Sequence, residues 1–272
     1  MQVNIDQLHW GDKLVGSIAF NMQPTDTALD ISAIDLHLHG GLHLLGSMRW
    51  DPQRTRFDGT LAARDIGKVL SAWDYAPTIN SRRFNAQVAL NWPGSPAGFA
   101  LKRSSGSLAV QAEDGSLHSG EASADALRVF GLLNFNALTR RLRLDFSDLF
   151  GKGMAYDNFS GEAVLTNGLL QTMSPLEMDG PSARLQLDGS LDLASDRVAM
   201  GLLVTLPVTN NLPLAAIIAG APQIGGVLFL VDRILGDKVA RFASVRYRIS
   251  GNWQQPSVDF DRAFDSRPAL ED

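Results

Sequence analysis

The sequence contains no cysteine, and this absence excludes several kinds of site at once. Disulfides, cysteine-ligated metals and thiol nucleophiles all require that side chain. Charged residues are also few, at 19%, against 45% apolar residues. The formal net charge of -5 is opposite in sign to the basic footprint of nucleic-acid-binding proteins. We therefore expect no thiol chemistry and no nucleic-acid partner.

The short motifs of common enzyme classes are absent as well. The chain has no G-x-x-x-x-G-K-[ST] phosphate loop, no G-x-G-x-x-G turn and no G-x-S-x-G nucleophile elbow. Without them, its serine, histidine and aspartate residues have no local arrangement typical of a catalytic triad. We predict a protein that is not an enzyme, with no catalytic residues and no cofactor.

Alternation of apolar and polar residues is the dominant pattern, and it is typical of strands with one apolar face. In the segment Arg141–Phe146, every second residue is apolar and the others are charged. Similar alternation recurs over residues 16–22, 84–92, 184–188 and 245–249. Glycines follow strands at Gly46, Gly189 and Gly251, where a bulge or bend would curve a sheet. These features predict a mainly β fold: an elongated, curved antiparallel sheet with an open groove, a few inserted helices and a C-terminal apolar helical hairpin.

Two short helices interrupt the expected strands. Asp65 can cap a helix near residues 65–75, whose Ile66, Val69, Leu70 and Trp73 form one apolar stripe. A second helix is expected near residues 123–134. The groove and these helices together span residues 1–205.

The segment Leu212–Val231 contains no charged residue, and its length is that of a membrane span. Gly220 and Pro222 divide it, however, into two pieces that are each too short to cross a bilayer. We expect an apolar helical hairpin over residues 206–240, with its second helix running to Leu235. Closing strands over 241–260 and a flexible tail over 261–272 complete the predicted organisation.

Three histidines lie close together in the sequence at His37, His39 and His43. On a strand, His37 and His39 share a face with Asp35, so a histidine–carboxylate metal site is geometrically allowed. The simpler interpretation is the polar face of an amphipathic strand, and we predict no metal.

Several segments resemble the C-terminal region of YhdP-type proteins, which are AsmA-like relatives of TamB. The resemblance covers roughly residues 60–260. It is carried by residues 91–96, 127–138, 140–150, 159–161, 179–184, 212–215 and 247–253. It implies an inner-membrane-anchored protein that crosses the periplasm as a curled β-sheet and moves phospholipid towards the outer membrane. Residues 1–16 show no signal peptide and begin within an expected strand, as a fragment of a longer chain would.

We therefore predict the lipid-binding distal segment of a periplasm-spanning bridge that moves phospholipid between the inner and outer membranes. The segment is expected in the periplasm, associated with a membrane and facing the outer one. Phospholipid acyl chains and the membrane surface are its expected partners, together with envelope proteins. The alternative is a non-catalytic envelope scaffold or interaction module whose apolar hairpin binds a partner protein.

Two sets of apolar residues are predicted to form its sites. Those expected to line the lipid groove are Leu142, Leu144, Phe146, Leu185, Leu187, Met200, Leu202 and Val204. Those expected to contact a membrane are Leu214, Ile217, Ile218, Val227, Leu228, Phe229 and Leu230.

Overall fold

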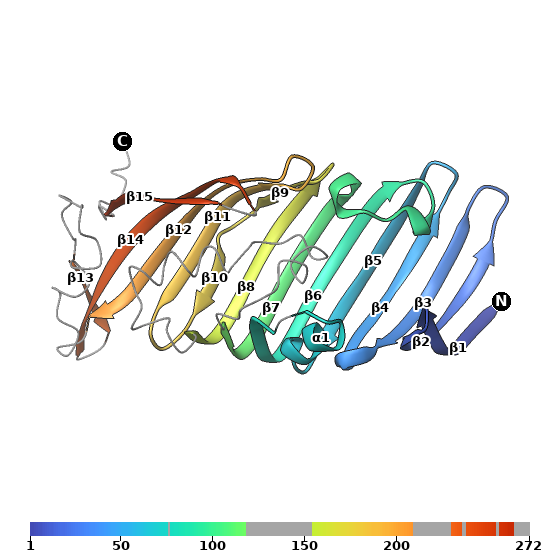
Figure 1. The fold of residues 1–272 in the computed structure, drawn as a ribbon, viewed down its shortest axis with the longest axis horizontal. Coiled ribbons are helices and arrows are strands. Elements are labelled where there is room, and N and C mark those ends of the chain that lie inside the picture. Colours follow the sequence, from blue (N-terminus) through green and yellow to red (C-terminus); the bar gives the residue numbers. More distant parts are fainter. Residues whose placement is uncertain (76, 118–153, 209–229, 236–237, 254–255, 264–272) are drawn as a thin grey trace.

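The computed structural model describes residues 1–75, 77–117, 154–208, 230–235, 238–253 and 256–263. These residues form fifteen strands, one α-helix and three short 3-10 turns (Figure 1). The strands are β1 (Gln2–Trp10), β2 (Lys13–Pro24), β3 (Leu29–Leu38), β4 (Leu42–Trp50), β5 (Arg54–Ala63), β6 (Ile79–Pro93), β7 (Ser105–Leu117), β8 (Met154–Thr166), β9 (Leu169–Thr172), β10 (Leu176–Asp179), β11 (Arg184–Asp192), β12 (Arg197–Val208), β13 (Leu230–Leu235), β14 (Lys238–Asn252) and β15 (Ser257–Ala263). The helix is α1 (Ile66–Ala72), and the turns are η1 (His39–Gly41), η2 (Pro96–Gly98) and η3 (Leu101–Arg103).

All the strands belong to one antiparallel sheet in which sequence neighbours are usually spatial neighbours. β9 and β10 together occupy a single position between β8 and β11, and β13 and β15 share the far side of β14. The sheet therefore has thirteen strand positions in succession, from β1 to β13. At about 4.8 Å between neighbours, this row is about 58 Å long. The prediction of a mainly β, elongated antiparallel sheet is confirmed.

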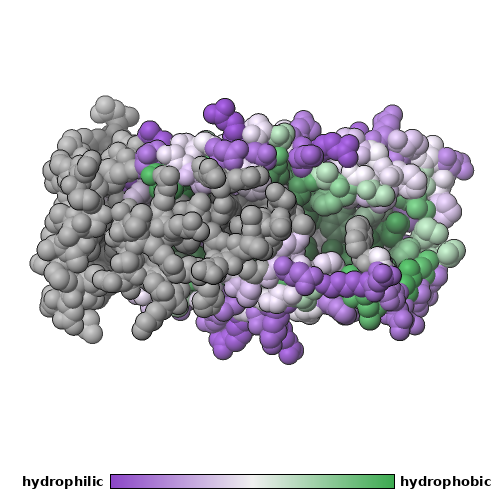
Figure 2. Space-filling view, in the orientation of Figure 1, coloured by the Kyte–Doolittle hydropathy of each residue, from purple (hydrophilic) through white to green (hydrophobic). Residues whose placement is uncertain are grey.

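The two faces of the sheet differ in character because apolar and polar residues alternate along each strand. In β5, for example, Phe57 is half-buried while Arg56 and Asp58 on either side are exposed. Figure 2 shows that the apolar face is hollowed between two polar rims, most clearly over the N-terminal strands at the right. We call this hollowed face the trough and the opposite face the outer face.

A line of irregular residues crosses β6, β7 and β8. Two consecutive side chains point away from the trough on each strand, so the alternation shifts by one residue there. The pairs are Arg82 and Arg83, Glu113 and Asp114, and Asp157 and Asn158. Asp114 has a φ of 49°, and ion pairs join Arg82 to Asp114 and Arg83 to Glu113. The pairing register is the same on both sides of this line, since Ser81 pairs with Gly115 and Arg83 pairs with Glu113.

The helix α1 connects β5 and β6 and lies at one rim, as Figure 1 shows. The carboxylate of Asp65 accepts hydrogen bonds from the backbone N–H groups of Gly67 and Lys68, at 3.0 and 3.3 Å. This confirms the predicted helix and its cap. Gly40 in η1 lies against α1. A Cβ added there would come within 2.6 Å of the Cα of Val69, so the close approach requires glycine.

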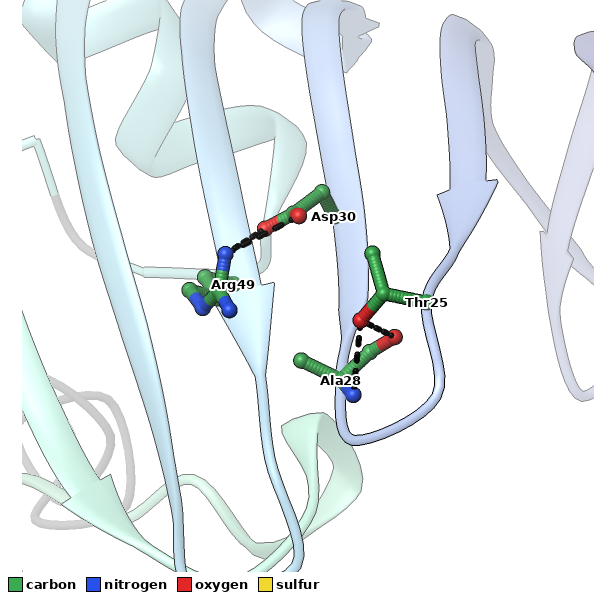
Figure 3. Close-up of polar contacts among 4 residues, drawn as sticks. All are labelled: Thr25, Ala28, Asp30 and Arg49. Carbon is green, nitrogen blue, oxygen red and sulfur yellow. Dashed lines mark hydrogen bonds and ion pairs between the residues drawn. The ribbon is translucent and has the colours of Figure 1, made fainter.

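Polar contacts on the outer face and at the turns fix neighbouring strands (Figure 3). Nη1 of Arg49 in β4 donates to both carboxylate oxygens of Asp30 in β3, at 2.9 and 3.0 Å. In the turn between β2 and β3, the hydroxyl of Thr25 donates to the backbone carbonyl of Ala28 at 2.9 Å and accepts from its N–H at 3.0 Å. Each exposed ion pair of this kind contributes only about 0–1 kcal/mol.

The C-terminal prediction is wrong where it can be compared with the structure. Residues Leu230–Leu235, expected in the second helix of the hairpin, form strand β13 paired with β14. The strand β12 ends at Val208 and the strand β14 begins at Lys238, so both enter the range 206–240 that was assigned to the hairpin. The strand β15 continues to Ala263, past the expected start of the tail. The remainder of the hairpin (209–229), the helix near 123–134 and residues 264–272 lie outside the described residues.

Candidate functional site

The trough is apolar without interruption across its N-terminal half. Residues paired directly across antiparallel strands point to the same face of a sheet. One such row runs through β1 to β7 and consists of Ile5, Ile18, Leu36, Leu44, Leu61, Ala86 and Val110. Its members are partly accessible, and Ile5 at the edge strand is 38% exposed. Figure 2 shows this part of the trough as a hollow coloured for hydrophobic residues.

A second row of paired residues continues the apolar face into the C-terminal half. It runs from β5 to β12 through Ala63, Phe84, Ala112, Phe159, Met178, Leu185 and Val204. The two rows overlap on β5, β6 and β7, so together they reach from β1 to β12. The apolar surface is therefore continuous from one end of the sheet almost to the other.

Five of the predicted groove residues lie on this apolar face. Leu185 pairs with Val204 and Leu187 pairs with Leu202, while Met200 follows on the same side of β12 opposite Gly189. Four of them are almost fully buried: Leu187, Met200, Leu202 and Val204 are 7, 5, 3 and 1% exposed. They belong to the largest hydrophobic cluster, with Tyr247 and Ile249 of β14. The other three, Leu142, Leu144 and Phe146, lie outside the described residues, as do Leu214, Ile217, Ile218, Val227, Leu228 and Phe229. Leu230 is the first residue of β13.

Sequence reasoning missed the N-terminal residues of the trough, although the signal was present. Met48 and Phe57 pair across β4 and β5 on the apolar face. The ring of Phe57 covers the paired glycines Gly46 and Gly59, where added Cβ atoms would lie 3.0 and 2.5 Å from ring carbons. The period-two pattern of residues 44–50 and 55–63 could have identified these positions.

A tyrosine of β8 is buried against β7 and β6. Tyr156 is 2% exposed, and its hydroxyl donates to the backbone carbonyl of Asn80 at 2.6 Å. Its ring lies over Gly115, where an added Cβ would be 2.4 Å from the tyrosine oxygen. Burial disfavours the phenolate and raises the pKa of Tyr156 to about 12.

Charged groups of the same strands lie on the outer face. Glu162 of β8 alternates with Gly161 and Ala163 of the trough, as Arg56 and Asp58 of β5 alternate with Phe57. Farther along, the guanidinium of Arg246 on β14 reaches across β12 to Asp188 on β11, at 3.1 and 3.2 Å. These charged side chains thus lie on one side of the sheet, while the trough on the other side offers apolar contact.

The histidine cluster lies on the outer face, and its membership differs from the sequence expectation. Asp35 and His37 come from β3, but the third residue is His43 of β4, which pairs directly with His37. His39 does not continue the face, because the strand ends at Leu38 and His39 begins the turn η1. The expected shared face of His37 and His39 is therefore wrong.

Among the described residues α1 is the single α-helix. No helix in this part of the chain is long and apolar enough to span a bilayer.

Comparison with known proteins shows the family of this chain. A profile described as "YhdP protein" matches residues 1–258. The chain belongs to the YhdP family. It is 27% identical over 263 residues to the intermembrane phospholipid transporter YhdP of Escherichia coli (strain K12). That alignment covers 92% of this chain and 20% of the relative, so the chain spans about a fifth of the transporter's length. No solved structure matches.

Proposed function

We propose that this chain is a lipid-binding segment of a bridge that moves phospholipid between the inner and outer membranes, with acyl chains lying in the trough. The observation that supports it best is the apolar face running continuously from β1 to β12. Membership of the YhdP family supports a role in phospholipid transport, since its Escherichia coli relative is an intermembrane phospholipid transporter.

The energetics of acyl-chain transfer require a surface of this kind. Each CH₂ group removed from water contributes about 0.8 kcal/mol, so ten methylenes contribute about 8 kcal/mol. An interruption by a charged side chain would raise a barrier of several kcal/mol, whereas a uniform apolar face lets a chain slide at nearly constant free energy. The phospholipid headgroup remains in water beyond the polar rims that Figure 2 shows.

A bridge also needs a sheet that can continue beyond this segment. β1 is an edge strand that pairs only with β2 among the described elements. Its free backbone groups can accept another antiparallel strand, as exposed sheet edges do. The trough would then extend past Ile5 without a break in its apolar face.

We propose further that this segment is the distal, periplasmic end and that the uncharged stretch Leu212–Val231 contacts a membrane. Each of its two pieces is too short to span a bilayer, but a short apolar piece can still bury its side chains at a bilayer surface. Replacing Ile217, Leu228 and Phe229 together by Asp should abolish binding to phospholipid vesicles. If vesicle binding persists and only the capture of an envelope protein is lost, this stretch is a protein-docking element instead.

The test of lipid binding uses two neighbouring residues whose side chains point to opposite faces of the sheet. Leu44 lies in the trough, whereas Leu45 is 46% exposed on the outer face. We expect native mass spectrometry of the purified chain to show bound phospholipid, which Leu44→Asp removes and the matched Leu45→Asp retains. A chain that never carries lipid, or equal lipid loss in both variants, would contradict the proposal.

A further inference from the structure

We propose that Asp35, His37 and His43 form a zinc-binding site on the outer face of the sheet, separate from the trough. Each residue offers one donor atom, and the three donor atoms lie within 4.8 Å of one another. Imidazole nitrogen and carboxylate oxygen are ligands that Zn²⁺ takes in proteins. The sequence alone led us to expect no metal, because the polar face of an amphipathic strand is the simpler explanation for these histidines.

The donor atoms are already close to the spacing that a zinc ion imposes. Nε2 of His37 and Nε2 of His43 lie 3.0 and 2.7 Å from the same oxygen, Oδ1 of Asp35. Two ligands at about 2.0–2.1 Å from a tetrahedral ion are about 3.3–3.4 Å apart. The two Nε2–Oδ1 distances therefore need to grow by only a few tenths of an ångström. The two nearly parallel rings must also rotate about their side-chain bonds, so that both Nε2 lone pairs point at the ion.

The backbone holds the ligands in this position before any ion binds. His37 and His43 are directly opposite each other on β3 and β4, joined by the three-residue turn η1. Asp35 is two residues before His37 and thus on the same face. The two imidazole rings stack with centroids 4.2 Å apart and planes 9° from parallel, and both Nε2 atoms lie beside the same carboxylate oxygen of Asp35. Little conformational entropy remains to be lost on binding.

The site would supply three protein ligands and leave the fourth position to water. The side chains of His37, Asp35 and His43 are 61, 46 and 35% exposed, so an ion can reach them from solvent. In the absence of an ion, two neutral imidazoles can each donate an Nε2–H to Asp35 instead. When zinc binds, each ring must carry its proton on Nδ1, and the ion replaces both hydrogen bonds. It would join β3 to β4 on the side of the sheet opposite the trough.

Competition between the purified full chain and a chromophoric zinc chelator tests this site. We expect one Zn²⁺ per chain, and a rise in melting temperature with added Zn²⁺ because the ion binds the folded state. His37→Ala, His43→Ala and Asp35→Asn should each weaken binding by about tenfold or more, on the scale of losing a metal-site interaction. Mg²⁺, which prefers all-oxygen octahedral sites, should cause no such shift.

His39→Ala and His9→Ala are matched controls, since neither residue belongs to the cluster. Both should bind Zn²⁺ as the unmodified chain does. Circular dichroism of each variant establishes that the sheet is intact, which the exposure of these side chains leads us to expect. The proposal is overturned if the chain binds no Zn²⁺, or if the cluster variants bind it as tightly as the two controls.

Discussion

At the scale of residues, Tyr156 shows how one side chain of β8 packs against β6 and β7. Its ring fills the space above Gly115, and its hydroxyl donates to the carbonyl of Asn80. A buried phenol with one strong hydrogen bond is stable only while it is neutral. The packing of β8 against β6 and β7 at this point therefore depends on the protonation of one side chain.

This dependence predicts a loss of stability at high pH. The pKa of Tyr156 is about 12 in the folded chain and near 10 in the unfolded chain, because burial disfavours the phenolate. Below pH 10 both states keep the proton and this residue adds no pH dependence. Between pH 10 and 12 only the unfolded state loses it, so the free energy of unfolding falls by about 1.4 kcal/mol per pH unit.

Denaturant titrations of the unmodified chain and Tyr156→Phe measure this effect. At pH 8 the variant should be less stable by about 1 kcal/mol, from the lost hydrogen bond to Asn80. As the pH rises from 10 to 12 this difference should shrink and reverse. A difference that stays constant across that range would contradict the assignment.

At the scale of elements, α1 shows how a short helix is maintained at the rim. Seven residues are too few for a stable isolated helix. Its stability therefore comes from the Asp65 cap and from the close approach of η1 at Gly40. We predict that Asp65→Ala destabilises the chain by about 1 kcal/mol, as loss of an N-cap does.

A thermal or chemical unfolding curve measures the effect of Asp65→Ala. Lys13→Ala is a suitable comparison, because it removes only the exposed ion pair with Asp74. That variant should change the free energy of unfolding by less than about 1 kcal/mol. Equal effects from both substitutions would show that the cap contributes nothing beyond a surface contact.

The helices and strands also show how much of the fold could be predicted from the sequence. Alternation places Leu185 and Leu187 on one face, and the signature Asp65 followed by an apolar stripe predicts α1, because both depend on local periodicity. Periodicity does not decide between helix and strand over only six residues, and Leu230–Leu235 was misassigned for that reason. The shift in alternation at Arg82–Arg83 and Glu113–Asp114 was also missed, since it depends on neighbouring strands in register.

Sites formed between strands were harder still to predict. The sequence suggested His37 with His39, but strand pairing brings His37 beside His43 instead. Whether His39 continues the strand depends on where the turn η1 begins, which alternation does not determine. Among the described residues, the trough was therefore predicted in outline, and the histidine cluster only in part.

At the scale of the whole molecule, the bend and twist of one sheet separate two surfaces along about 58 Å. The trough gathers apolar side chains from β1 to β12, and the outer face gathers charges such as Arg49 and Arg246. A sheet with one apolar face usually buries that face against a second layer of secondary structure. Here the N-terminal part of that side remains partly accessible, as Figure 2 shows, which is the property that a lipid conduit needs.

The most direct test of the central claim is photo-cross-linking to radiolabelled phospholipid along the trough. A photoreactive phenylalanine analogue is placed at Ile18, Phe57 or Leu108, which lie on β2, β5 and β7, and at the outward neighbours Ser17, Arg56 and Ser107. We predict that all three trough positions cross-link to phospholipid and that their neighbours do not. Cross-linking that is equal on both faces, or absent from the trough, would contradict the account.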